Sequence, residues 1–209
     1  DLNRATDWRL PDEEANTVAG LVIHEAQMIP NEGQVFSFHG FRFVRIEAPG
    51  IDVDETSLCG VVLHSDLEET GDFSCSHPGI DQLQRNIRWS QKGNFLEVPS
   101  DCPQREKMGW TGDIQIYAPT ACFVMDSAGF LTKWLRDLAA DQHADGRIPH
   151  VIPSPPDYPM FKVVGTGGSA GWGDACTVVA ATLHLYYADE RILAEMYPVM
   201  KRWLAFIAA

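Results

Sequence analysis

Apolar and polar residues alternate along the first third of the chain. Over residues 35–46 large apolar side chains take turns with polar ones, and this two-residue period predicts β-strands. Residues 60–64 predict a further strand, while residues 31–33 and 49–50 carry the Asn, Gly and Pro residues typical of turns. Since so few strands cannot close a large sheet structure alone, we expect residues 1–72 to be the end of a β domain that begins elsewhere.

The apolar spacing becomes helical from about residue 74. Five helices are predicted: one beginning at Ser76 or His77 with Pro78 in its first turn, then Thr111 to about Val124, Ser127 to about Gln142, one after Asp174, and one over about 190–207. Pro119 marks where the second helix would kink. Residues 147–171 are rich in Pro and Gly and predict a long loop, which is either functional or a flexible surface insertion.

Two arrangements of these helices are open. One is an all-α bundle with aromatic residues in its core. The other is a set of helix pairs whose connecting loops gather polar and aromatic residues at one end. The second is favoured, because Trp, Asp and Gly residues concentrate just before helix starts.

Composition narrows the classes of partner. The chain has 209 residues, is 45% hydrophobic and carries 16 basic against 29 acidic residues, for a formal charge of −13. This is enough apolar material for a buried core, and the negative field disfavours nucleic acid and anionic membrane surfaces, while a neutral sugar is compatible with it. No apolar run is long enough to span a bilayer, and the N-terminal residues do not form a signal peptide. The compartment stays open between cytoplasm, periplasm and secretion.

Cysteine and histidine spacing gives no metal or cofactor signal. The five cysteines are scattered without a CxxC pair, and the seven histidines lack an HExxH arrangement. Cys102 stands beside two carboxylates, but no base is evident near it, so it is a poor candidate for a nucleophile. We therefore expect no disulfide framework, no metal and no cofactor.

The segment most suited to chemistry spans residues 99–113. It contains three carboxylates, an arginine and a tryptophan: Asp101, Glu106, Asp113, Arg105 and Trp110. Pro103, Gly109 and Gly112 argue against one continuous helix, so we expect a shaped loop that leads into a helix. Glycoside hydrolysis needs one protonated carboxylic acid and a second carboxylate, and crowding or partial burial of carboxylates raises the pKa of at least one of them. Trp110 would suit stacking on a sugar ring.

The alternative for this segment is an acidic, capped helix start. In that interpretation Asp113 only stabilises the first turn, Arg105 pairs with a neighbouring carboxylate, and Trp110 belongs to the core. A second candidate is the Gly-rich run 167–174, where Trp172 would form a stacking wall and Asp174 would accept a sugar hydroxyl. Asp174 would equally suit a simple N-terminal cap.

The two halves of the first segment resemble a known family. Residues 101–106 followed by 109–113 closely resemble the signature of the inverting α-L-rhamnosidases of glycoside hydrolase family 78. Further similarity lies in residues 41–44 (the end of the β-sandwich before the catalytic domain), 64–73 (the link), 89–96 (the first barrel helix) and 172–175 (a later active-site loop). Lys107 and Met108 depart from the pattern at positions without an essential role.

The resemblance implies a mainly α fold with an N-terminal β portion. Residues 1–72 would be the C-terminal part of a β-sandwich domain, and residues 73–209 would be the N-terminal half of an (α/α)6 barrel of the six-hairpin glycosidase type. The implied activity is hydrolysis of terminal α-L-rhamnose with inversion in a bacterium. The implied site residues are Glu106 as general acid, Asp101, Arg105, Trp110 and Asp113 lining the rhamnose subsite, and Trp172 with Asp174 completing a wall.

The resemblance also implies that the general base is a Glu from a later barrel segment. We therefore expect the remainder of the protein's own polypeptide to complete the barrel and the isolated chain to be inactive. A rhamnoside is the expected partner, with no nucleic acid and no membrane, and homo-oligomer formation is open. The alternatives are another barrel glycoside hydrolase, an unsaturated glucuronyl hydrolase or polysaccharide lyase, and a non-catalytic carbohydrate-binding module.

Overall fold

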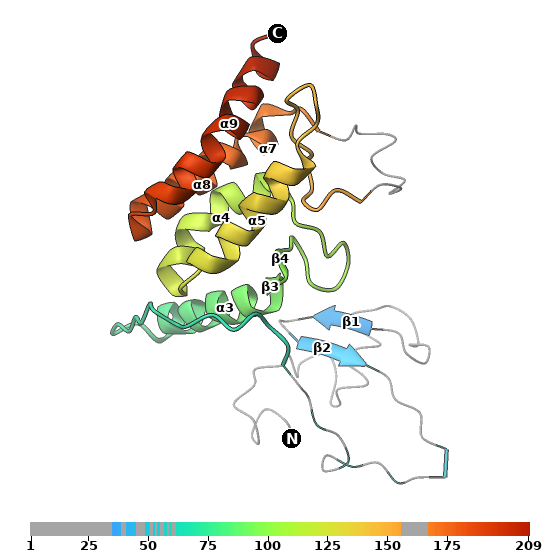
Figure 1. Ribbon diagram of the computed structural model, residues 1–209. Coiled ribbons are helices and arrows are strands. Elements are labelled where there is room, and N and C mark those ends of the chain that lie inside the picture. Colours follow the sequence, from blue (N-terminus) through green and yellow to red (C-terminus); the bar gives the residue numbers. More distant parts are fainter. Residues whose placement is uncertain are drawn as a thin grey trace. The chain divides into compact units, whose positions relative to one another are not determined.

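The chain divides into two units, Asp1–Val61 and Val62–Ala209, in the computed structural model (Figure 1). The structure describes residues 35–38, 41–44, 49, 50, 52, 54, 57, 59, 62–155 and 167–209. Within these residues, no helix combines the length and the apolar character that crossing a membrane requires.

The first unit contains an antiparallel hairpin. Strand β1 (Val35–Phe38) pairs with β2 (Phe41–Val44), so the strands predicted from alternation are confirmed here, as is the turn at residues 49–50. The strand predicted over 60–64 is wrong for residues 62–64, which form no strand, because the described residues offer that stretch no partner strand. The predicted turn at 31–33 lies outside the described residues. Membership of a β-sandwich stays a prediction.

The second unit is helical, and all five predicted helices are confirmed. Its elements are α3 (Pro78–Asn94), β3 (Phe95–Leu96), β4 (Val98–Pro99), α4 (Thr111–Val124), α5 (Ala128–Asp141), α7 (Ala170–Gly173), α8 (Ala175–Tyr187) and α9 (Glu190–Ile207). Local chemistry explains the boundaries: Pro78 occupies the first turn of α3, and the Asp189 side chain caps α9 by accepting from the Ile192 N–H. The short β3–β4 hairpin and the single turn α7 were not predicted.

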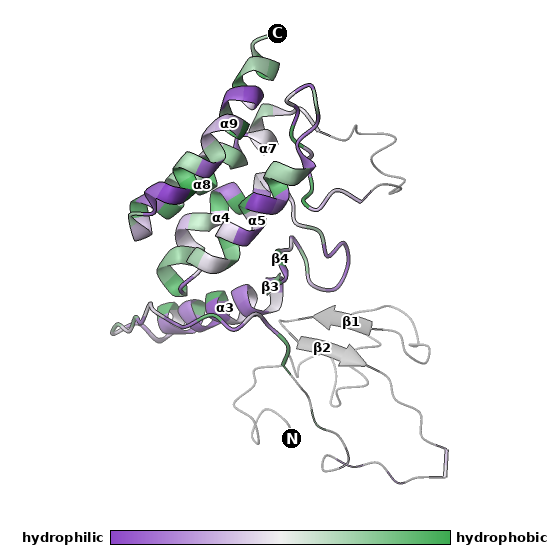
Figure 2. Cartoon of the chain, in the orientation of Figure 1, coloured by the Kyte–Doolittle hydropathy of each residue, from purple (hydrophilic) through white to green (hydrophobic). Residues whose placement is uncertain are grey.

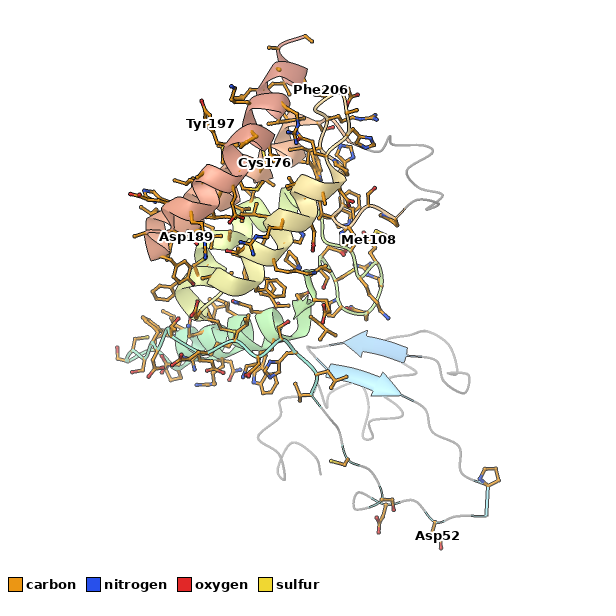
Figure 3. All side chains as sticks on the ribbon, viewed as in Figure 1. Asp52, Met108, Cys176, Asp189, Tyr197 and Phe206 are labelled. Carbon is orange, nitrogen blue, oxygen red and sulfur yellow. The ribbon has the colours of Figure 1, made fainter. Side chains whose placement is uncertain are left out.

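The core lies between α4, α5, α8 and α9. Helix α8 contains no Asp, Glu, Lys or Arg, and α4 contains only Asp113, so both are apolar around most of their surface (Figure 2). Helices α5 and α9 are amphipathic and pack their apolar faces against α8, burying Trp134 and Trp203 completely. Cys176, labelled in Figure 3, lies among these helices and is also fully buried.

Some apolar side chains of α4 and α8 are left uncovered by the described residues. Ile116 and Leu185 are each 79% exposed, and Phe123 is also exposed. Ile80 and Leu83 on α3 are exposed as well, although their spacing marks one helix face. Several large apolar side chains left exposed in this way are typical of a unit that packs against further protein.

Candidate active site

A closed loop connects β4 to α4 and carries most of the predicted site residues. The Asp101 N–H donates to the Met108 carbonyl at 3.0 Å, and the Met108 N–H donates to Asp101 Oδ1 at 3.1 Å. Inside this pair, the Lys107 N–H donates to the Cys102 carbonyl at 3.1 Å, with Lys107 in the left-handed region at φ 59°. The prediction of a shaped loop leading into a helix is confirmed.

The loop is anchored to the core where it enters α4. The Ile152 N–H donates to the Gly109 carbonyl at 2.9 Å, and Trp134 Nε1 donates to the Ile152 carbonyl at 3.3 Å. A Cβ atom on Gly109 would lie 2.3 Å from the Ile152 oxygen, so only glycine allows this approach. Two residues after Gly109, the Thr111 N–H and hydroxyl both donate to the His150 carbonyl at 2.9 Å. The long loop was predicted over residues 147–171, and its described part at residues 147–155 fixes the start of α4 through these hydrogen bonds.

Glu106 is oriented by the tryptophan four residues later. Trp110 Nε1 donates to Glu106 Oε2 at 2.9 Å. Trp110 is half-buried and Glu106 is exposed, so the alternative in which Trp110 is a core residue does not fit. A carboxylate oxygen of Glu106 and one of Asp101 lie within 4.8 Å of each other. The loop therefore gathers two of the three predicted carboxylates.

Asp113 in the first turn of α4 is the third carboxylate of this group. Asp113 is an exposed residue, but surrounding atoms partly desolvate its carboxyl, and this desolvation raises its pKa. The negative charges of Asp101 and Glu106 raise the pKa of Asp113 further, while a backbone hydrogen bond opposes them. Crowding of carboxylates was expected to raise the pKa of at least one of them, and the carboxyl whose pKa is raised is that of Asp113.

A cleft of about 610 Å³ lies beside the loop, between α3, α4 and α7. Three predicted site residues line it, Asp101, Asp113 and Trp172. Trp172 is 40% exposed, and its indole lies so close to Gly112 that a Cβ there would be 2.9 Å from Nε1. Behind it, the His150 ring is 5.6 Å from the Trp172 ring. The cleft thus combines carboxylates with one aromatic wall, as sugar recognition requires.

The other predicted residues do not line this cleft in the described part of the chain. Glu106 and Trp110 stand beside it, and Arg105 is exposed without an ion pair among the described residues. Asp174 Oδ1 accepts from Trp203 Nε1 at 2.9 Å, and its side chain does not cap α8. Asp174 therefore holds a core tryptophan.

Asp101, Cys102 and Glu106 also offer three potential metal ligands. One ligand atom from each lies within 4.8 Å of the other two. Exposed acidic groups of this kind are common without a metal, and the Cys102 thiol already donates to Asp101. We assign no metal to this group.

The sequence reasoning missed three residues that shape the site. Gln115 lines the cleft, and its amide Nε2 donates to the Gly171 carbonyl beside Trp172. His150 is buried, donates to or accepts from the Ser169 hydroxyl at 3.0 Å, and supports Trp172. Burial and the nearby charge of Arg147 lower the pKa of His150. Cys102 was rejected as a nucleophile, and its role as a hydrogen-bonding group was not considered. The positions of Gln115, two residues after Asp113, and of Cys102, inside the segment 99–113, were signals by which these two residues could have been found.

Comparison with known proteins identifies the family to which these residues belong. Residues 68–209 match the family described as bacterial alpha-L-rhamnosidase 6 hairpin glycosidase domain, which is more than half of the chain. The chain belongs to this family. Residues 1–55 also match a family described as transporter associated domain, but this match covers much less than half of the chain and does not assign it. The predicted class, mainly α and of the six-hairpin glycosidase type, is confirmed.

Several relatives carry the name of the same glycosidase. An alpha-L-rhamnosidase of Formosa agariphila is 42% identical over 176 residues, covering 81% of this chain and 18% of the relative. The crystal structure of Streptomyces avermitilis alpha-L-rhamnosidase complexed with L-rhamnose has a TM-score of 0.64 at 42% identity, covering 68% of this chain and 13% of that one. The native enzyme from Aspergillus terreus has a TM-score of 0.65 at 41% identity, covering 74% and 18%. This chain therefore spans less than a fifth of the length of these relatives.

Proposed function

We propose that this chain carries part of the active site of an enzyme that removes terminal α-L-rhamnose from rhamnosides with inversion, with Glu106 as the general acid. Family membership supports the substrate class, as does the relative whose structure is described as a complex with L-rhamnose. The observation that carries the proposal is a carboxyl group, Glu106, fixed by Trp110 beside a cleft lined by Asp101, Asp113 and Trp172.

The hydrogen bonding of Glu106 suits proton donation. Oε2 accepts from Trp110 Nε1, whereas Oε1 has no hydrogen-bond partner among the residues that the structure describes. A protonated carboxyl can accept on one oxygen and donate from the other, so Oε1 is free to carry the proton to a leaving oxygen. Trp110 would thus orient the acid, and this is a more specific role than stacking on the sugar.

The cleft supplies the contacts for a sugar ring. The carboxylates of Asp101 and Asp113 can accept sugar hydroxyls, and the exposed indole of Trp172 can pack against an apolar ring face. Arg105 is next to the acid in sequence and does not line this cleft, and we propose that it contacts the sugar from beside it. Asp174 would act indirectly: its hydrogen bond fixes Trp203 against Gly173, and Gly173 follows Trp172 in the chain.

Asp101 is a poor general base for inversion. Inverting enzymes separate their two carboxyl groups by roughly 6.5–9.5 Å to admit a water molecule. The Asp101 and Glu106 oxygens lie within 4.8 Å, and both Asp101 oxygens already accept hydrogen bonds from the loop. We therefore propose that the base comes from the longer polypeptide, which the short coverage of the relatives supports, and that the 209-residue chain alone is inactive.

The test is hydrolysis of p-nitrophenyl α-L-rhamnopyranoside by the complete protein and by the 209-residue chain. Matched p-nitrophenyl β-D-glucopyranoside and β-D-galactopyranoside serve as substrate controls. We expect the complete protein to release p-nitrophenol from the rhamnoside only, and the short chain to release none. Activity on a control glycoside alone would discard the rhamnose assignment, and robust hydrolysis by the short chain would show that the base lies within it.

The stereochemical part needs its own measurement. Proton NMR during the first turnovers should show β-L-rhamnose appearing before mutarotation produces the α anomer. Initial release of the α anomer would mean retention, which needs two carboxyl groups about 5–5.5 Å apart. In that event the close pair of Asp101 and Glu106 would have to be reassigned as nucleophile and acid.

A further inference from the structure

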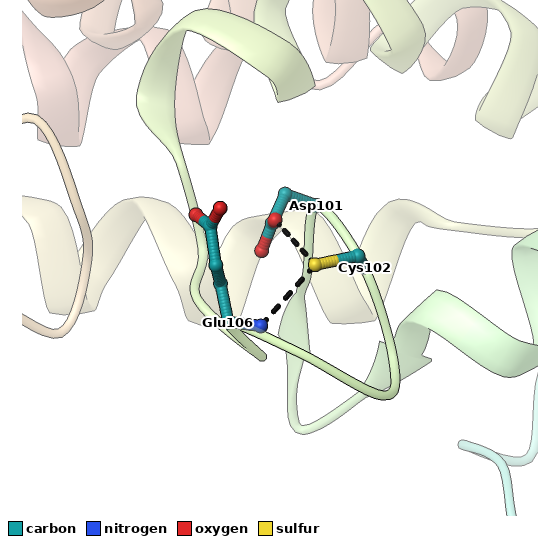
Figure 4. Close-up of side chains that lie close together, drawn as sticks. All are labelled: Asp101, Cys102 and Glu106. Atoms are coloured by element: carbon teal, nitrogen blue, oxygen red, sulfur yellow. Dashed lines mark hydrogen bonds between the residues drawn. The ribbon is translucent and has the colours of Figure 1, made fainter. Parts of the chain in front are cut away.

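The thiol of Cys102 lies between the two carboxylate residues of the loop. Its Sγ–H donates to Asp101 Oδ2 at 2.7 Å, and Sγ accepts from the Glu106 N–H at 3.2 Å (Figure 4). A thiol has one hydrogen and free lone pairs, so it can donate and accept at the same time. The side chain is half-buried and forms no disulfide.

We propose that Cys102 is a positioning residue that holds Glu106 and Asp101 in their working arrangement. The N–H that it accepts belongs to the main chain of Glu106, so it fixes the point from which that side chain extends. The acceptor to which it donates is one oxygen of Asp101, whose other oxygen takes the Met108 N–H. The thiol is thus the one group whose hydrogen bonds reach both residues at once within the described loop. This proposal rests on the proposed hydrolysis.

The loop does not depend on the thiol for its closure. The main-chain hydrogen bonds between Asp101 and Met108, and between Lys107 and Cys102, remain when the Cys102 side chain is removed. Glu106 also keeps its hydrogen bond to Trp110. Loss of the thiol should therefore leave the protein folded and should shift the Glu106 carboxyl locally. A small displacement of a catalytic group is enough to slow a reaction.

The test compares Cys102→Ala and Cys102→Ser in the complete enzyme on two substrates. Methyl α-L-rhamnopyranoside has a poor leaving group that needs the acid, whereas p-nitrophenyl α-L-rhamnopyranoside needs it much less. We expect Cys102→Ala to lower kcat/KM about tenfold on the aryl substrate and by a clearly larger factor on the methyl substrate. Cys102→Ser, which keeps a donor and an acceptor, should recover most of the loss. Cys75→Ala, at an exposed cysteine outside the loop, should match the wild type.

Two results would overturn the positioning role. Wild-type kinetics of Cys102→Ala on both substrates would show that the thiol does not act on the acid. An equal loss on both substrates, with a lower thermal midpoint and no rescue by Ser, would show a merely structural residue. Failure of the proposed function would look different: the wild-type enzyme would not cleave rhamnosides, or Glu106→Gln would leave both rates unchanged, and the Cys102 proposal would fall with it.

Discussion

The contact between Gly109 and Ile152 makes the loop sensitive to a single methyl group. Gly109→Ala would place Cβ 2.3 Å from the Ile152 carbonyl oxygen and 3.2 Å from Trp134 Nε1. Gly109 is not among the glycines with positive φ, so alanine is compatible with its backbone and the effect is steric. Restoring ordinary contact at 3.4 Å requires the two segments to separate by about 1.1 Å.

That separation has a cost in stability and in activity. Overpacking of a tight contact costs about 1–3 kcal/mol, and weakening the hydrogen bond from the Ile152 N–H to the Gly109 carbonyl adds about 1 kcal/mol. We therefore expect a loss of roughly 2–4 kcal/mol in the free energy of unfolding. Because Trp110 follows directly and orients Glu106, a shift of about 1 Å should lower kcat about 100-fold.

Thermal unfolding followed by circular dichroism and steady-state kinetics on p-nitrophenyl α-L-rhamnopyranoside would measure both effects. The matched control is Gly129→Ala in α5, where a new Cβ meets nothing within 4 Å. That change should stabilise the protein by about 0.4–1 kcal/mol and leave kcat unchanged. If Gly109→Ala keeps wild-type stability and kcat, the close approach to Ile152 does not set the position of the loop, and the argument is refuted.

Three further changes probe other contacts. Gly173→Ala would put Cβ 2.5 Å from the Trp203 ring, so the thermal midpoint should fall by the equivalent of about 1–3 kcal/mol, whereas Gly171→Ala, with open space, should cost far less. Asp113→Asn should raise the thermal midpoint at pH 7, because folding raises the pKa of Asp113 above 3.8 and its ionisation therefore destabilises the native state. This gain in thermal midpoint should vanish below pH 3.8, where Asp113 is protonated in both states, and a gain that is the same at every pH would contradict the prediction. Folding lowers the pKa of His150 below 6.5, so the wild type should lose stability as the pH falls below 6.5, and in acid titrations followed by circular dichroism His150→Asn should lose less. Equal acid loss in both proteins would refute the last prediction.

The helices were predictable because their signals are local. Pro78 in a first turn, the apolar spacing of α5 and the apolar run of α8 each define an element without knowledge of the rest of the chain. The short hairpin from Phe95 to Pro99 was not predictable, since it is held by only two residue pairs. The strand prediction for residues 62–64 was wrong because β propensity alone does not form a strand, which also needs a partner strand.

The site was only partly predictable. The sequence placed Asp101, Glu106 and Asp113 on one loop and helix start, and the structure brings them together. It could not show that Asp174 turns to Trp203, because that contact joins residues 29 positions apart in a packed core. The support of Trp172 by His150 was hidden for the same reason. Contacts between distant segments depend on packing, and residue spacing carries little information about them.

The measurement that tests the account most directly is kcat of Glu106→Gln in the complete enzyme on methyl α-L-rhamnopyranoside. Gln keeps the size of the side chain, but its amide cannot act as a general acid that transfers a proton to the leaving oxygen. We expect kcat to fall by about 10²–10⁴-fold, with KM changed little because the sugar contacts are intact. Glu190→Gln, in the first turn of α9 and outside the cleft, should behave as wild type. A kcat for Glu106→Gln close to that of the wild type would contradict the assignment of Glu106 as the general acid.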